Sequence, residues 1–224
     1  MSTRETFFAT IKQAVAAQPV TEPKLPEHDE SIIRLTRKDA DLAAKLAEMI
    51  NAAGMEAVLL NSHHDLPAAV KAICVKHGVK VALADADPAI DLLVHAATSC
   101  GVGVRRWSAE QNVAASFEVD AGLTGVAYAV AETGSLVMMA SPMTGRLTSL
   151  APMVHIALIR RNQIVADLLD LFDPSCLGKS PASDKRTMPS GCVLITGPSK
   201  TADIELKLVT GVHGPGFVYA IIMP

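Results

Sequence analysis

The chain lacks the cysteine patterns that hold metals or redox clusters. It has four cysteines in 224 residues, and none lies in a Cys-x-x-Cys pair. No group of cysteines and histidines has the spacing of a zinc or iron–sulfur site. Cys74 and Cys100 fall in apolar helical patterns, where a small buried thiol is common. We therefore expect no metal site and no cofactor in this chain.

An excess of positive charge is also absent. Lys and Arg total 20 against 23 Asp and Glu, and the basic residues are scattered along the chain. Binding to nucleic acid requires clustered positive charge, so no nucleic-acid partner is expected.

Long apolar runs are missing as well. No stretch approaches the roughly 18 apolar residues of a membrane-spanning helix. Glu5 and Lys12 interrupt the region where a signal peptide would be continuously apolar. The sequence thus predicts a soluble, cytoplasmic protein without membrane insertion.

A complete phosphate-binding P-loop is absent too. Gly178–Ser180 reads Gly-Lys-Ser, the end of that motif, but the glycine required five positions earlier is replaced by Asp173. An ATP site is not indicated.

Hydrophobic residues are plentiful, at 50% of the chain. Segments with helical spacing of these residues alternate along the chain with short apolar runs. Helical spacing predicts helices and apolar runs predict strands, in regular succession through the first half. Such alternation is typical of an α/β fold with a mostly parallel sheet and helices on both faces. The expected helices are 39–54, 66–78 and 87–101, and the expected strands are 55–60, 79–84 and 102–107.

The two ends of the chain have their own predicted elements. Near the N-terminus, Phe7, Phe8, Ile11 and Val15 share one face of a predicted helix, and a Pro-rich linker follows it. We therefore divide the chain into an N-terminal helical arm and linker, residues 1–30, and one domain, residues 31–224. Near the C-terminus the patterns predict a strand at 192–197, a helix at 201–211 and a strand at 216–223.

The first candidate site is the segment that reads Glu-Thr-Gly-Ser. Glu132 follows an apolar strand, and ligands of open α/β sheets bind beyond the carboxyl ends of strands. Gly134 and Ser135 could present backbone amides to an anion, and Thr133 is a further ligand-binding candidate beside them. A hairpin turn with an exposed carboxylate is the alternative.

Two histidines are further candidates. His155 begins an apolar strand, where it could act as a general base or proton donor, or could simply hydrogen-bond to the backbone. His213 lies in a tight loop before Gly214 and Pro215, which favours a functional position.

The third candidate segment is a predicted strand, glycine turn and helix start. Gly197 ends the strand, and Ser199 or Thr201 could cap the helix or bind an anion at its N-terminus. Asp203 and Glu205 already place negative charge there, which disfavours a plain phosphate cradle.

Three blocks of this sequence resemble the LUD domain family: Gly122–Val137, Ser149–Ile159 and Thr196–Pro215. The resemblance implies the fold shared by ribose-5-phosphate isomerase, glucosamine-6-phosphate deaminase and CoA transferases. It also implies a role in oxidising L-lactate to pyruvate beside two iron–sulfur partner subunits, which would carry the redox centres.

Three functions remain open at this stage. The chain could be an accessory or ligand-binding subunit of a lactate-oxidising complex. In that role it could bind a small anionic ligand and could form a homo-oligomer. It could instead be an enzyme with CoA-transferase-like or phosphosugar-isomerase-like chemistry, with Glu132 as nucleophile or base. An interaction domain with a vestigial pocket is the third alternative. The alternatives would be separated by whether the candidate residues meet around one pocket.

Overall fold

The structure is a computed structural model that describes residues 3–17, 29, 34, 36, 41–108, 110, 113–173, 176, 189–201, 209–211 and 213–224. The chain divides into two units, Met1–Ile33 and Arg34–Pro224. The expected boundary after residue 30 stays a prediction.

The first unit contains the predicted N-terminal helix. This helix, α1 (Arg4–Ala17), has no buried residue. Its aromatic side chains Phe7 and Phe8 are about half exposed and pack edge to face against each other. Ile11 and Val15 are exposed too, so the predicted apolar face exists.

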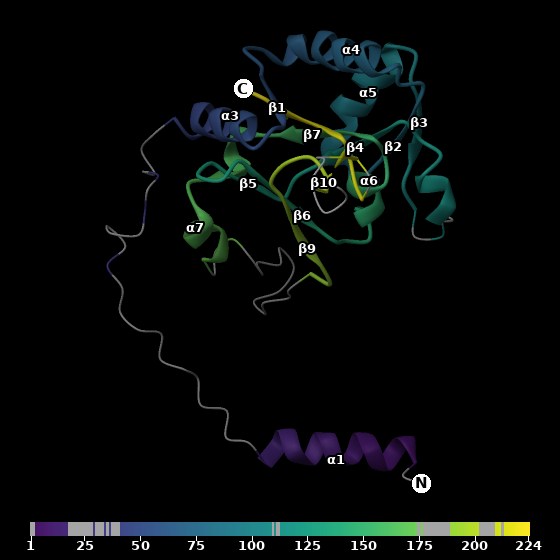
Figure 1. Ribbon diagram of the computed structural model, residues 1–224, viewed down its shortest axis with the longest axis vertical. Helices are drawn as coiled ribbons and strands as arrows, with labels where there is room; N and C mark the ends of the chain where they lie inside the picture. Colours follow the sequence, from purple (N-terminus) through teal and green to yellow (C-terminus); the bar gives the residue numbers. More distant parts are fainter. Residues whose placement is uncertain are drawn as a thin grey trace. The chain divides into compact units, whose positions relative to one another are not determined.

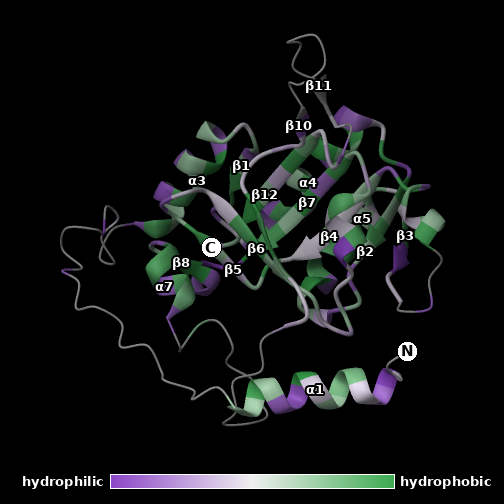
Figure 2. Cartoon of the chain, turned by 60° about the horizontal axis from the view of Figure 1, so that its bottom comes forward, coloured by the Kyte–Doolittle hydropathy of each residue, from purple (hydrophilic) through white to green (hydrophobic). Residues whose placement is uncertain are grey.

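The second unit is built on a parallel sheet with the strand order β1-β12-β7-β4-β2-β3. Every neighbouring pair in this sheet is parallel. Hydrophobic residues run along β7 and β12, in the middle of the sheet (Figure 2). The prediction of a mostly parallel α/β fold is therefore confirmed. The strands are β1 (Glu56–Leu59), β2 (Val81–Ala84), β3 (Gly103–Arg106), β4 (Ala121–Gly125), β7 (Val154–Ile159) and β12 (Phe217–Ile222).

Two long helices cover one face of the parallel sheet. They are α4 (Leu66–His77) and α5 (Asp91–Ser99), which lie next to each other and apart from α3 (Figure 1). Apolar side chains of both helices form one core with alternate residues of the strands, such as Leu123 and Ile156. This alternation follows from the two-residue repeat of a strand.

The other face is covered by two helices and a second sheet. α3 (Leu42–Ala52) buries Leu46 and Ile50 against Ala157 and Ile159 of β7. The helix ends at Ala52, and Gly54 follows its last turn with a φ of 86°. The short helix α6 (Arg146–Leu150) packs directly on β4.

The second sheet has the order β8-β5-β6-β9. β5 and β6 form an antiparallel pair separated by the turn that contains Glu132, which agrees with the hairpin that the sequence offers as the alternative for this segment. α7 (Leu168–Phe172) packs beside this sheet. The strands are β5 (Tyr128–Val130), β6 (Ser135–Met139), β8 (Ile164–Val165) and β9 (Cys192–Ile195).

The helix predicted at 201–211 is wrong at its described ends. β10 (Lys200–Thr201) and β11 (Val209–Thr210) are strands that pair antiparallel. The pairing continues at Ser199, whose backbone nitrogen donates to Pro215 O and whose carbonyl accepts from Gly211 N. These backbone bonds replace the ones that a helix would make. Residues 202–208 lie outside the described part of the chain.

One glycine decides how closely α6 approaches the sheet. A Cβ built on Gly122 would lie 1.8 Å from the Thr148 carbonyl oxygen, which belongs to the backbone of α6. Gly122→Ala should therefore lower the free energy of unfolding by about 3 kcal/mol, because neither backbone can give way cheaply. Chemical denaturation measures this loss.

Gly103→Ala is the matched control on the same sheet. A Cβ at Gly103 would meet only Lys80 O, at an ordinary 3.6 Å. This variant should stay within about 0.5 kcal/mol of wild type. Equal losses in the two variants would contradict the steric explanation.

Candidate functional site

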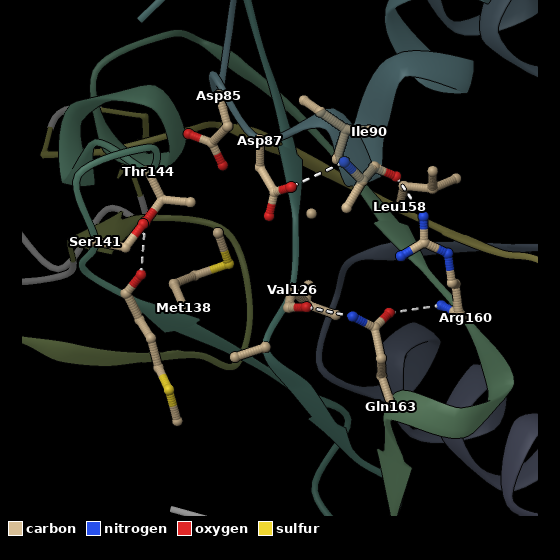
Figure 3. Close-up of a pocket in the computed structure, with 14 residues that line it drawn as sticks. Asp85, Asp87, Ile90, Val126, Met138, Ser141, Thr144, Leu158, Arg160 and Gln163 are labelled. Carbon is tan, nitrogen blue, oxygen red and sulfur yellow. Dashed lines mark hydrogen bonds between the residues drawn. The ribbon is translucent and has the colours of Figure 1, made fainter. Parts of the chain in front are cut away.

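A pocket opens at the carboxyl edge of the parallel sheet. Asp85 follows β2, Gly125 ends β4 and Arg160 follows β7, and all three line this pocket. Its volume is about 220 Å³. Figure 3 shows Asp85 and Asp87 on one side and Arg160 and Gln163 on the opposite side. The position is the crevice where open α/β sheets bind ligands.

Hydrogen bonds hold most polar groups of the pocket in place. Asp87 Oδ1 accepts from the backbone nitrogen of Ala89 at 2.8 Å, and the Arg160 guanidinium donates to the carbonyl of the same residue. Gln163 Oε1 accepts from Arg160 N at 2.8 Å, while its Nε2 donates to Val126 O at 2.6 Å (Figure 3). The polar walls are thus ordered before any ligand arrives.

A buried polar cluster lies beneath α6 and reaches the pocket through Asp85. Its members Asp85, Thr124, Thr148 and His155 are each at most 1% exposed. Thr124 Oγ1 and His155 Nε2 are hydrogen-bonded at 2.8 Å. The backbone of Thr148 touches Gly122, the register partner of His155.

Three atoms of this polar cluster have no hydrogen-bond partner within the described part of the protein: Asp85 Oδ1, Thr148 Oγ1 and His155 Nδ1. A buried polar atom without a partner costs roughly 1–3 kcal/mol. Buried polar atoms are nearly always hydrogen-bonded, so three such atoms in one place single out this polar cluster as a candidate for function.

Burial shifts the pKa values of the two titratable groups of the polar cluster, Asp85 and His155, in opposite directions. Desolvation raises the pKa of Asp85 to about 7, and the nearby Thr148 hydroxyl and Gly145 amide only moderate this rise. Neither group makes a hydrogen bond to Asp85 Oδ1. Desolvation lowers the pKa of His155 to about 4, so the imidazole is neutral near pH 7.

The predicted residues of the Glu-Thr-Gly-Ser segment lie in the β5–β6 turn. Thr133 Oγ1 and Ser135 Oγ are hydrogen-bonded at 2.6 Å, and Ser135 Oγ is bonded to Thr196 Oγ1 at 2.6 Å. Gly134 has a φ of 68° and packs against the backbone of α3. Glu132 is partly exposed, and its strand belongs to the second sheet rather than to the parallel one.

The predicted residues near the C-terminus form a neighbouring group. The bond between Ser135 and Thr196 joins the β5–β6 turn to the segment that contains Gly197. Ser199 Oγ accepts from His213 N at 3.3 Å, and the His213 side chain is exposed. Thr201 lies in β10, and Asp203 falls outside the described residues.

His155 stands apart from both of those groups. It is fully buried in β7 and belongs to the polar cluster beside the pocket. No hydrogen bond between described residues joins it to Glu132, Ser199 or His213. The described residues that line the pocket include none of the predicted site residues. Their functional roles stay predictions.

Sequence reasoning missed the residues that line the pocket. Asp85 and Asp87 follow the apolar run 79–84 directly, and Arg160 follows the run 154–159. Polar residues at the ends of buried strands were therefore the available signal. The order of the strands, which brings these ends together, is not visible in the sequence.

The described residues hold neither a metal cluster nor a membrane-spanning helix. No three histidine, cysteine, aspartate or glutamate side chains among them gather as they would around a metal ion. Within the same ranges, no helix has the length and apolar character needed to cross a membrane.

The family model described as the LUD domain matches residues 43–223, nearly the whole second unit. The chain therefore belongs to the LUD domain family.

Individual relatives are proteins named lactate utilization protein C. The one from Bacillus velezensis is 39% identical over 118 residues, which cover 51% of this chain and 48% of that protein. The one from Bacillus subtilis is 36% identical over 118 residues, which again cover 51% of this chain and 48% of that protein. The one from a Geobacillus species is 30% identical over 67% of this chain and 65% of its own length. This chain spans about half the length of the first two relatives.

A solved structure shares the fold. The crystal structure of a DUF162 family protein from Deinococcus radiodurans superposes with a TM-score of 0.56, covering 82% of this chain and 97% of its own. Its sequence identity of 23% supports the fold alone.

The raised pKa of Asp85 predicts a specific dependence of stability on pH. The folded state holds this proton more tightly than the unfolded chain, whose value is near 3.8. The stabilisation is complete below about pH 4 and is lost as the pH rises to about 7. Asp85→Asn should therefore gain about 2 kcal/mol relative to wild type between pH 5 and pH 7, measured by urea unfolding.

Asp120→Asn provides the control for this measurement. Asp120 is exposed and accepts backbone hydrogen bonds at the other edge of the same sheet. Its variant should follow the wild-type pH dependence. Parallel curves for wild type and Asp85→Asn would rule out a raised Asp85 pKa.

Proposed function

We propose that this chain takes part in the oxidation of L-lactate to pyruvate as a ligand-binding subunit that works with iron–sulfur partner subunits. The observation that carries the proposal is the match to proteins named lactate utilization protein C, at 36–39% identity in the two Bacillus proteins. Membership of the LUD domain family over residues 43–223 supports the same role.

The pocket supports a binding role within that system. It lies at the sheet edge where this class of fold holds small molecules, and it offers carboxyl, guanidinium and hydroxyl groups. The four cysteines lack the spacing of a cluster site, so the proposal gives the electron-carrying clusters to the partner subunits.

Deletion of the gene for this chain should abolish growth on L-lactate in the source organism and leave growth on glucose unchanged. Growth rates on the two carbon sources measure this, and a plasmid copy of the wild-type gene should restore growth. Affinity purification of the tagged chain should recover the iron–sulfur subunits. Normal growth of the deletion strain on L-lactate would contradict the proposal.

A second candidate is an enzyme with CoA-transferase-like chemistry at Glu132. The hydrogen-bonded hydroxyls of Thr133, Ser135 and Thr196 begin one residue after Glu132, and hydroxyls of that kind could orient an anionic substrate. The carboxylate would attack an acyl-CoA carbonyl, release the CoA thiolate and leave an acyl anhydride on Glu132.

Incubation with acetyl-CoA distinguishes this enzyme from the binding subunit. An enzyme should show an acetyl mass increase on the intact protein that hydroxylamine removes, and Glu132→Gln should lose it. Unchanged mass in the wild-type protein would eliminate this second candidate.

A further inference from the structure

We propose that the pocket at the carboxyl edge of the sheet binds a small carboxylate, with the carboxyl group of Asp85 as the acid that donates a hydrogen bond to the bound anion. The inference deepens the proposed function, since it names the class of ligand for the same pocket.

Asp85 combines two properties that rarely occur together. Its side chain lines an open pocket, yet it is only 1% exposed and its Oδ1 has no partner within the described residues. Structural carboxylates at such depth are normally paired with a cation or capped by amides. Among the described residues, no cation binds the carboxyl oxygens of Asp85, and only the Thr148 hydroxyl and the Gly145 amide lie near them. At the pocket wall, its protonated form can donate a hydrogen bond to a ligand.

Burial, more than the surrounding charges, favours the protonated form of Asp85. Asp87, on the same loop, opposes ionisation, and Arg106 of β3 favours it but is itself paired with Asp91. From β7, His155 is neutral near pH 7 because burial lowers its pKa to about 4. Desolvation outweighs the remaining effects and raises the pKa of Asp85 to about 7.

Arg160 gives the pocket a cation opposite this acid. Its guanidinium contacts a backbone carbonyl, and it has no ion-pair partner among the described residues. A ligand carboxylate can accept a hydrogen bond from the acid form of Asp85 and attract this guanidinium. An ionised Asp85 would instead repel the same ligand.

The remaining walls limit the size and nature of the ligand. Ile90, Val126, Met138 and Leu158 present apolar surface, and Ser141 and Thr144 contribute hydroxyls. A volume of about 220 Å³ is below the roughly 300–1,000 Å³ of pockets for drug-sized ligands. Short-chain carboxylates, with or without a hydroxyl or oxo group, fit this description.

The test is isothermal titration calorimetry of the full-length chain with acetate, propionate, pyruvate and L-lactate. With a pKa near 7, Asp85 is mostly protonated at pH 6 and mostly ionised at pH 8. The Kd of a bound carboxylate should therefore rise about tenfold between these two pH values. Binding at pH 7 should take up about half a proton, measured as the dependence of the heat on buffer ionisation enthalpy.

Single variants distinguish the contribution of Asp85 to binding from that of Arg160. Asp85→Asn keeps a hydrogen-bond donor of the same shape, so it should bind without pH dependence and without proton uptake. Arg160→Gln should weaken binding several-fold and still take up the proton. Asp120→Asn, at the opposite edge of the sheet, should match wild type. L-lactamide, the neutral analogue of L-lactate, should bind at least tenfold more weakly.

Two results would overturn this inference: no binding of any of the four carboxylates, or binding by wild type without proton uptake. Neither depends on a variant that might fail to fold. Proton-linked binding in a chain whose deletion leaves growth on L-lactate normal would defeat the proposed function alone. A growth requirement without carboxylate binding would defeat this inference alone.

Discussion

The contact between α6 and β4 at Gly122 is the constraint on which the rest of the candidate site depends. Because Gly122 has no side chain, the Thr148 carbonyl can lie where a Cβ would otherwise be. This approach closes α6 over the sheet and seals Thr124, Thr148 and His155 from solvent. It also leaves Asp85 at the boundary between this buried layer and the pocket.

The two titratable groups buried in this way, Asp85 and His155, change the free energy of unfolding in opposite directions as the pH rises. Asp85 favours the folded state at low pH, where its carboxyl group is neutral, and this advantage is lost as the pH rises to about 7. His155 favours the folded state above about pH 6.5, and its advantage is lost as the pH falls to about 4. Between those values the contributions of Asp85 and His155 to the pH dependence of stability nearly cancel.

The sequence revealed the architecture more fully than the site. Helical and strand periodicities in the first half depend on local spacing, and that half folds as they predict. The segment at 199–211 departs from its prediction because Ser199 pairs with Pro215 and Gly211. These backbone hydrogen bonds are tertiary contacts, and local helix propensity does not predict them. The pocket was missed for a related reason. Asp85 and Arg160 are distant in sequence and meet only because the strand order places β4 between β2 and β7.

The same strand order explains why the predicted residues divide into separate groups. Glu132 does follow a strand, but that strand, β5, pairs antiparallel with β6 in the second sheet, so it does not open onto the carboxyl edge of the parallel one. Its neighbours Gly134 and Gly197 are required where the chain passes close to the backbone of α3 and Ala53. Their glycine character is therefore explained by packing. Asp85 has no such explanation, since one oxygen of its buried carboxyl group has no hydrogen-bond partner among the described residues. An unexplained cost at the edge where ligands bind is a stronger indication of function than a motif that the fold itself accounts for.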